Sequence, residues 1–190
     1  NLPSARGQGE PVTGRINPPS GATFEGLMMG AADTQFLLAS DAGYGFVAKL
    51  SDLQTKNRSG KTVLTLPNAS SVVQPALISQ KKKSCVVAVS NEGRMLMFPL
   101  SELPELARGK GNKIINIPTA RLKNREEWMV GVQIVTPEDI LLIFSGKRHL
   151  KLKFSDLERY RGERGRRGLK LPKGLQKVDT LQIERHVDTT

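Results

Sequence analysis

The segment Ser51-Asp52-Leu53, followed by a basic glycine-containing loop and then by Thr62-Val63-Leu64-Thr65-Leu66-Pro67, decides the fold of this chain. It recurs about every fifty residues, as Ser101-Glu102-Leu103 with Lys113-Ile114-Ile115-Asn116-Ile117-Pro118 and as Ser155-Asp156-Leu157 with Leu169-Lys170-Leu171-Pro172. A fainter copy occupies residues 1–18. A repeat of this length made of strands is typical of a propeller or a similar array, in which each copy buries its apolar face against the next.

The rest of the sequence predicts short strands separated by turns. Runs rich in β-branched or apolar residues are bounded by Gly, Pro, Asn, Asp or Ser, which is typical of strands. These runs are residues 12–16, 24–29, 36–40, 46–50, 62–66, 72–78, 85–89, 95–100, 113–117, 128–135, 140–144, 150–154, 169–171 and 178–183. Glycine turns at 41–43, 91–93 and 146–147 join the first two strands of each unit. We therefore expect an all-β, β-propeller fold of four-stranded blades, with about 3.5 to 4 repeats.

The expected organisation is a single propeller domain over residues 1–190. It consists of a partial first blade at 1–30, repeats at about 35–79, 84–135 and 139–183, and a polar tail at 184–190. The Ser-Asp-Leu triplets predict short helical turns with Ser or Asp as the N-cap. The chain has no initiator Met and starts inside a repeat, so we expect it to be a fragment of a longer protein.

Composition favours a polyanionic partner. The 190 residues carry a net charge of +11, and the pI is about 10.0. Such an excess indicates nucleic acid or anionic lipid. No apolar run approaches the roughly 20 residues of a membrane-spanning helix, and no signal peptide is visible, so nucleic acid is favoured. The single cysteine, Cys85, lies in an apolar run, which predicts a buried, inert thiol in a reducing cytoplasmic compartment.

The sequence predicts no catalytic or metal site and no bound cofactor. His149 and His186 are far apart and have no Cys, His or Asp cluster at ligand spacing. The glycines at 43–45 and 109–111 do not extend to a nucleotide-binding motif. Tyr160 stands between arginines, as a nucleophile for a phosphodiester could, but the repeat aligns it with Lys56 and Leu106, which indicates a structural position.

The basic loops are the candidate functional feature. Lysine and arginine beside glycine suit a phosphate backbone, because the charges displace counterions and glycine lets backbone N–H groups approach the phosphates. One such loop per repeat predicts a curved positive band. The candidate DNA-binding residues are Arg6, Lys56, Arg58, Lys61, Arg108, Lys110, Lys113, Lys147, Arg148, Arg161, Arg164, Arg166, Arg167 and Lys170. Aromatic residues are few and not interleaved with the basic ones, which favours backbone contact with a duplex over base stacking. A protein-interaction propeller with incidental charge is the alternative.

Several segments resemble the C-terminal domains of the gyrase A/topoisomerase IV A family. They are residues 1–9, ASDAGYGF at 39–46, GRMLMFP at 93–99, GKGNKIINIP at 109–118 and GERGRRG at 162–168. The gyrase branch carries a Gln-Arg-Arg-Gly-Gly-x-Gly box in one such loop, and this chain has only degenerate versions at 108–111 and 161–168. The resemblance therefore favours the topoisomerase IV branch, with a gyrase DNA-wrapping domain as the alternative.

The resemblance implies a broken propeller that binds and bends duplex DNA on its outer edge and steers substrate choice. The holoenzyme would be a bacterial ATP-dependent type IIA topoisomerase that decatenates chromosomes and relaxes supercoils in the cytoplasm, at the nucleoid. Its catalytic tyrosine, Mg²⁺ carboxylates and ATP site would lie outside this chain, which alone would be non-catalytic. Implied partners are the topoisomerase IV B subunit, a second copy of the A subunit through the N-terminal region, and a condensin-type protein, for which Arg148 and Lys173 are candidate contacts.

Overall fold

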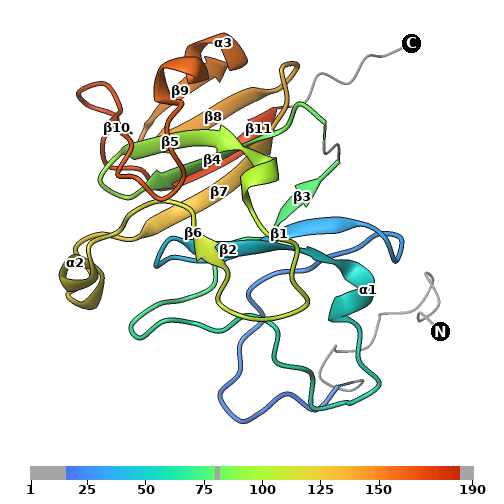
Figure 1. Ribbon diagram of the computed structural model, residues 1–190. Coiled ribbons are helices and arrows are strands. Elements are labelled where there is room, and N and C mark those ends of the chain that lie inside the picture. The colour runs from blue at the N-terminus through green and yellow to red at the C-terminus, as the bar shows by residue number, and fades with distance from the viewer. Residues whose placement is uncertain (1–15, 80–81, 185–190) are drawn as a thin grey trace.

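The computed structural model describes residues 16–79 and 82–184, and strands dominate them (Figure 1). The strands are β1 Gln35–Ser40, β2 Tyr44–Lys49, β3 Ala76–Ile78, β4 Cys85–Ser90, β5 Arg94–Pro99, β6 Asn112–Lys113, β7 Met129–Val135, β8 Ile140–Ser145, β9 Arg148–Lys153, β10 Leu169–Lys170 and β11 Thr180–Glu184. The helical segments are α1 Leu50–Leu53, η2 Leu100–Glu102, α2 Thr119–Lys123, α3 Phe154–Leu157 and η3 Glu158–Tyr160. The all-β prediction is confirmed.

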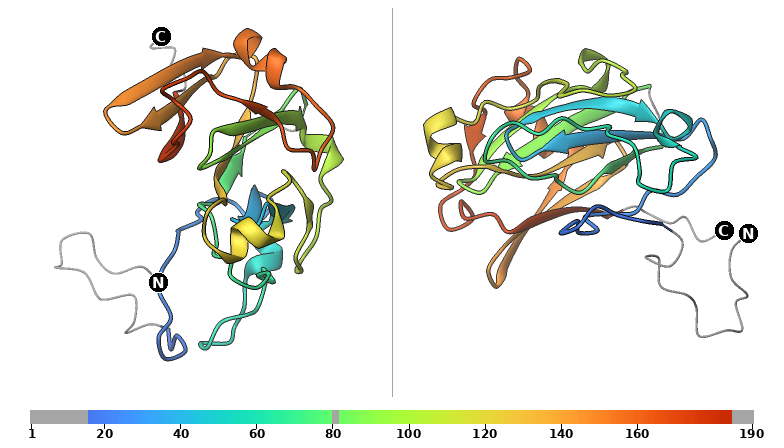
Figure 2. Two further views of the ribbon diagram at one scale, coloured as in Figure 1. Left: turned by 90° about the vertical axis from the view of Figure 1, so that its left-hand side faces the viewer. Right: turned by 90° about the horizontal axis from the view of Figure 1, so that it is seen from below.

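The strands of the described residues form a first sheet in the order β3-β1-β2-β6, a second in the order β10-β5-β4-β7 and a third in the order β11-β8-β9. All pairings within these sheets are antiparallel. The three sheets follow one another through the molecule, with the second between the other two (Figure 1, Figure 2).

Each sheet is built around a tight hairpin. The β1–β2, β4–β5 and β8–β9 turns contain Gly43, Gly93 and Gly146, with φ of 82°, 70° and 57°. These φ values lie in the region that glycine enters without steric cost, so the predicted hairpin turns are confirmed.

The third strand of a repeat completes the sheet of the preceding repeat. Strand β6 belongs by sequence to the second unit but pairs with β2 of the first, and β10 of the third unit pairs with β5 of the second. Gly111 and Gly168 permit this crossing, because both have positive φ and a Cβ on either would collide with the backbone of Gly45 or Met95. Sequence period alone does not tell which hairpin a strand joins, so this exchange between units is seen only in the structure.

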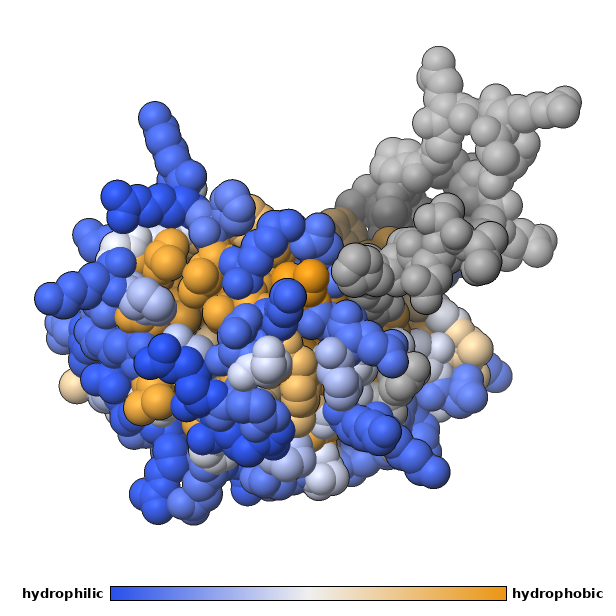
Figure 3. All heavy atoms as spheres, turned by 90° about the horizontal axis from the view of Figure 1, so that it is seen from above, coloured by the Kyte–Doolittle hydropathy of each residue, from blue (hydrophilic) through white to orange (hydrophobic). Residues whose placement is uncertain are grey.

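The third sheet has three strands within the described residues, so β9 is its edge. Lys151 and Lys153 are exposed while Leu152 is buried, so polar and apolar side chains alternate between the two faces of this strand. Charged side chains on an edge strand discourage pairing with other chains. Seen from above, the molecule shows apolar residues in the centre of this face and polar residues around it (Figure 3).

Two predicted strands do not form. Residues 24–29 are irregular, and residues 62–66 make only an isolated bridge between Leu64 and Gly109. In the other units the corresponding segment reaches the hairpin of the preceding sheet, but no hairpin precedes β1 among the described residues. Residues 24–29 run beside Pro75, which has no N–H to donate to a ladder. The predicted run at 12–16 falls almost wholly outside the described residues.

The predicted helical turns form at each Ser-Asp-Leu triplet, but not with Ser or Asp as the N-cap. Each begins one residue earlier, so the N-caps are Lys49, Pro99 and Lys153, none with a side-chain cap bond. In α3 the carboxylate of Asp156 instead accepts a hydrogen bond from the backbone N–H of Lys153 at 2.9 Å. Helix α2 was not predicted.

The core lies between the sheets, and the two faces of β4 belong to two different core clusters. Its alternate residues face opposite ways: Val86 and Ala88 pack in the cluster shared with the first sheet, and Cys85, Val87 and Val89 in the cluster shared with the third. A strand buried on both faces needs a continuous apolar sequence, which is what residues 85–89 supply. Cys85 is 6% exposed, so its predicted burial is confirmed.

Candidate nucleic-acid interface

The basic loops follow corresponding helical segments, α1, η2 and η3, in successive units. We call residues 54–61, 107–111 and 161–168 the first, second and third loops. The second loop packs on the segment after the first, through a hydrogen bond from Gly109 N–H to Val63 O of 2.8 Å. The third loop packs in the same way on the segment after the second, from Gly165 N–H to Ile114 O at 2.9 Å. Successive loops are therefore neighbours through the segments that follow them.

Most cations of the first and second loops are open to solvent. Lys56, Arg58, Arg108 and Lys110 are exposed, and none forms an ion pair within the described part of the chain. Lys61 is also exposed, and its Nζ donates to the carbonyl oxygen of Asp52 at 2.6 Å. Exposed lysines and arginines without a carboxylate partner keep their full charge for an anionic ligand.

The hairpin and strand cations are also exposed. This group comprises Lys147, Arg148, Lys170 and Lys173. Arg148 lies beside Gly174, so Arg148 and Lys173, the two candidate contacts for a partner protein, come from neighbouring parts of the surface. Arg6 lies outside the described residues.

The arginines of the third loop are engaged with the protein itself. Arg161 forms an ion pair with Glu158 at 2.7 Å, and Arg166 forms one with Glu163 at 2.9 Å. The Arg164 guanidinium donates to the carbonyl oxygen of Lys113 at 2.7 Å. This loop has the most arginines of any in the sequence, yet they are largely used to hold the loop in place.

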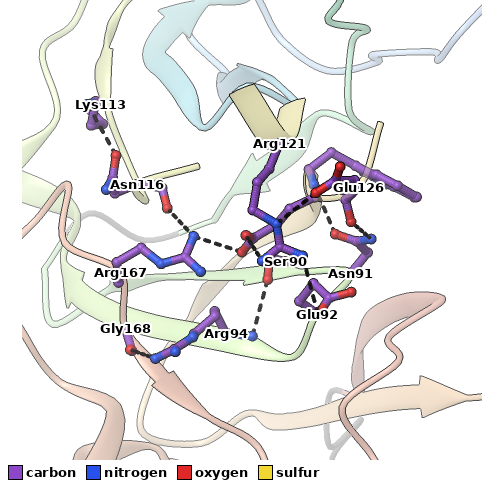
Figure 4. Close-up of polar contacts among 12 residues, drawn as sticks. Ser90, Asn91, Glu92, Arg94, Lys113, Asn116, Arg121, Glu126, Arg167 and Gly168 are labelled. Atoms are coloured by element: carbon purple, nitrogen blue, oxygen red, sulfur yellow. Dashed lines mark hydrogen bonds and ion pairs between the residues drawn. The ribbon is translucent and has the colours of Figure 1, made fainter. Parts of the chain in front are cut away.

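The third loop is also anchored at Glu127, whose side chain is fully buried. Its partners Arg121 and Arg167 are labelled in Figure 4. Its carboxylate accepts hydrogen bonds from Arg167 at 2.8 Å and from Arg121 at 3.0 Å. Arg167 also donates to the carbonyl oxygen of Asn116 at 3.0 Å. A buried carboxylate needs such partners, since an unpaired one would lose its hydration without compensation. Sequence reasoning missed Glu127, because its partners come from two other segments.

The ion pair at the start of the third loop shifts both of its members. The hydrogen bond from Arg161 lowers the pKa of Glu158, and the same bond raises the pKa of Arg161. The Arg161 guanidinium also lies 3.8 Å from the sulfur of Cys85. These contacts fix the direction in which the loop leaves η3.

An aromatic ring lies among the basic residues, contrary to the expectation from sequence. The Nζ of Lys110 is 4.5 Å from the centre of the Tyr44 ring, and that of Lys113 is 5.7 Å from it. Strand exchange brings Tyr44 of the first unit against the second loop, which a reading of neighbours along the sequence cannot reveal.

The described residues contain no group of three or more His, Cys, Asp and Glu side chains that could hold a metal ion. Tyr160 is 2% exposed and packs in the core, as a structural residue does. Its expected alignment with Leu106 was two residues off: Arg161 pairs with Met97 as Glu105 pairs with Val47, so Tyr160 corresponds to Pro104. No helix in the described part is long and apolar enough to cross a membrane. His186 lies outside that part.

Comparison with known proteins identifies the family. The model of the DNA gyrase C-terminal domain, a β-propeller, matches residues 34–79 and 86–136. The A subunit of DNA topoisomerase 4 from Pseudomonas aeruginosa is 52% identical over 97% of this chain, and that from Escherichia coli K12 is 47% identical over 96%. The chain spans 24% of the length of each of these relatives.

Solved structures agree with the family match. The E. coli ParC C-terminal domain superposes with a TM-score of 0.87 at 46% identity, covering 97% of this chain and 74% of that one. A DNA gyrase A C-terminal domain superposes with a TM-score of 0.60 at 20% identity, covering 78% of this chain and 48% of that one, which shows a common fold. The predicted propeller fold is thereby confirmed, and this chain belongs to the gyrase-type C-terminal β-propeller family, in the branch of the topoisomerase IV A subunits.

Proposed function

We propose that this domain binds duplex DNA through the phosphate backbone and has no catalytic role of its own. The observation that carries the proposal is the recurrence of exposed cations in the loops of successive units, which among the described residues are unpaired in the first and second loops and mostly paired in the third. A single basic loop would be an ordinary solvated surface. One basic loop in each successive unit supplies positive charges at intervals, which suits the regularly spaced phosphates of a DNA backbone.

The proposed contacts divide into two groups. Exposed and half-buried residues would approach phosphates directly, namely Lys56, Arg58, Lys61, Arg108, Lys110, Lys113, Lys147, Arg148, Arg166 and Lys170. Arg161, Arg164 and Arg167 would act mainly by holding the third loop, while their charge adds to the local potential. Arg6 would extend the first group.

The relatives suggest a wider role for the whole protein. We propose that the parent subunit belongs to a bacterial, cytoplasmic topoisomerase IV, in which this domain bends DNA and directs the enzyme to its substrates during decatenation and supercoil relaxation. In that assembly ATP and Mg²⁺ would serve other domains. The B subunit and a second copy of the A subunit would be its partners, and a condensin-type protein would contact Arg148 and Lys173.

The salt dependence of DNA binding tests the proposal. Each phosphate contact that releases a counterion contributes about −0.9 to the slope of log K against log salt. We expect a slope of several units, and similar affinity for two unrelated duplexes of equal length. A double Lys82→Ala, Lys83→Ala variant is the matched control, since it removes two exposed cations outside the loops. A flat salt response, or no binding at low salt, would contradict DNA binding and favour a protein-interaction propeller.

Ligation of nicked circles separates the two branches of the family. If the domain bends DNA without chiral wrapping, the linking number of the ligated circles stays close to that without protein. A large shift of one sign would instead support the gyrase-type wrapping function.

A further inference from the structure

Tyr44 lies beside two lysines. It is the first residue of β2 and pairs directly with Lys113 of β6. Its ring packs partly against the core shared by the first two sheets, while Lys110 and Lys113 lie within 6 Å of the ring centre. The backbone of Lys113 is itself fixed by Arg164, which donates to its carbonyl oxygen. Three successive units therefore contribute to one small site.

The hydroxyl group of Tyr44 forms no hydrogen bond with another described residue. It is also not one of the buried polar atoms left without a partner, which are Ser40 Oγ, Arg94 Nε and Arg164 Nε. Tyr44 is half-buried, and its phenol oxygen is not completely shielded from solvent. The two lysines likewise form no ion pair with a carboxylate in the described part of the chain.

The equivalent position in the second sheet is different. Arg94 begins β5 and pairs with Lys170 of β10, as Tyr44 pairs with Lys113. Its guanidinium donates to the carbonyl oxygen of Gly168 at 3.3 Å, so it stabilises the strand exchange. Tyr44 makes no such bond, although the backbone around it is the same. A structural role for the Tyr44 hydroxyl is therefore not supported at this position.

We propose that Tyr44, Lys110 and Lys113 form a phosphate-binding site for duplex DNA. The Tyr44 hydroxyl donates a hydrogen bond to a phosphate oxygen, and the two ammonium groups neutralise that phosphate and its neighbour. Tyrosine is one of the ordinary hydrogen-bond donors to phosphates. Because the ring holds both lysines by cation–π contact, less side-chain freedom is lost on binding. This inference rests on the proposed DNA-binding function.

The Tyr44→Phe variant tests the inference, since it keeps the ring and removes only the hydroxyl. We expect its affinity for a duplex to fall roughly 3- to 10-fold, the range of a typical hydrogen bond that replaces one to water. The salt slope should stay unchanged, because no charge is lost. Lys110→Ala and Lys113→Ala should each reduce the slope by about 0.9. Tyr160→Phe, at the other of the two tyrosines, is the matched control and should bind like the wild type.

The outcomes separate this inference from the proposed function. If the wild-type chain binds DNA with a steep salt slope and Tyr44→Phe binds equally well, the phosphate site is wrong and DNA binding stands. If the wild type does not bind, both fail. Thermal unfolding of each variant accompanies the titrations. If Tyr44→Phe unfolds at a lower temperature and Tyr160→Phe loses affinity to the same degree, the effect is one of folding and the inference is overturned.

Discussion

The second and third loops have the same place in their units and use their charges in opposite ways. The second loop has two cations, Arg108 and Lys110, and neither has a carboxylate partner among the described residues. The third loop has four arginines, of which Arg161, Arg166 and Arg167 pair with carboxylates and Arg164 with a backbone carbonyl.

The difference teaches that the number of basic residues in a loop is a poor measure of its capacity to bind an anion. A cation already paired with a carboxylate must exchange one partner for another, so it gains less from a phosphate than an unpaired one does. The second loop, which has fewer charges, is therefore the better candidate for contact with DNA phosphates. The arginine-rich third loop mainly stabilises the packing between units.

Removal of Arg167 should have the largest effect on stability, because its ion pair with Glu127 holds the third loop against the protein. In Arg167→Ala the fully buried Glu127 loses one of its two partners. We expect the free energy of unfolding to fall by about 2–3 kcal/mol, somewhat less than for a buried ion left wholly unpaired. Urea denaturation provides the measurement. Arg166→Ala is the matched control and should change stability by no more than about 0.5 kcal/mol, since its ion pair is exposed. Equal losses of stability in the two variants would show that the ion pair with Glu127 does not stabilise the third loop more than an exposed pair does.

The second loop should dominate DNA binding. In Arg108→Ala, Lys110→Ala we expect the slope of log K against log salt to become shallower by about 0.9 for each lost contact. Stability should hardly change, because neither side chain is buried. Salt titrations by fluorescence anisotropy measure the slope. If Lys82→Ala, Lys83→Ala reduces it equally, net charge and not loop position controls binding.

Much of the fold could be predicted because period and turn chemistry are local properties. The hairpins around Gly43, Gly93 and Gly146 follow from glycine turns between apolar runs. Strand exchange could not be predicted, since β6 and β10 fit either their own hairpin or the preceding one in pattern. The choice depends on close approaches such as that of Gly111 to Gly45, which appear only in three dimensions.

The candidate site was predictable as a set of loops but not residue by residue. Charge is visible in sequence, whereas pairing with Glu127 or with the carbonyl of Lys113 depends on segments about 40–50 residues away. Tyr44 was missed for the same reason. Lys110 comes just before β6 and Lys113 lies in it, and β6 reaches Tyr44 only because it pairs with β2 of the preceding unit.

Neutralising Glu163 should free Arg166 to bind a DNA phosphate. Glu163→Gln leaves Arg166 without its ion-pair partner and removes a negative charge from the proposed DNA-binding face. We expect DNA affinity to rise roughly threefold and the salt slope to steepen by up to about 0.9. Anisotropy titrations at two salt concentrations measure both. An unchanged affinity would mean that Arg166 faces away from the path of the DNA.

The smallest expected effect concerns pH and the ion pair at the start of the third loop. The pKa of Glu158 is lowered from its ordinary value of 4.5 by the hydrogen bond from Arg161, so the folded state favours the ionised form. The resulting stability is present above the unfolded pKa near 4.5 and is lost as the pH falls through the lower folded value. Because both side chains are more than a third exposed, solvent screening limits the contribution to a few tenths of a kcal/mol. Denaturation at pH 6 and pH 3 should therefore show a slightly larger acid-induced loss in the wild type than in Glu158→Gln. An identical loss in the two proteins would mean that this pair positions the chain without stabilising it, unlike Arg167 and Glu127 in the same loop.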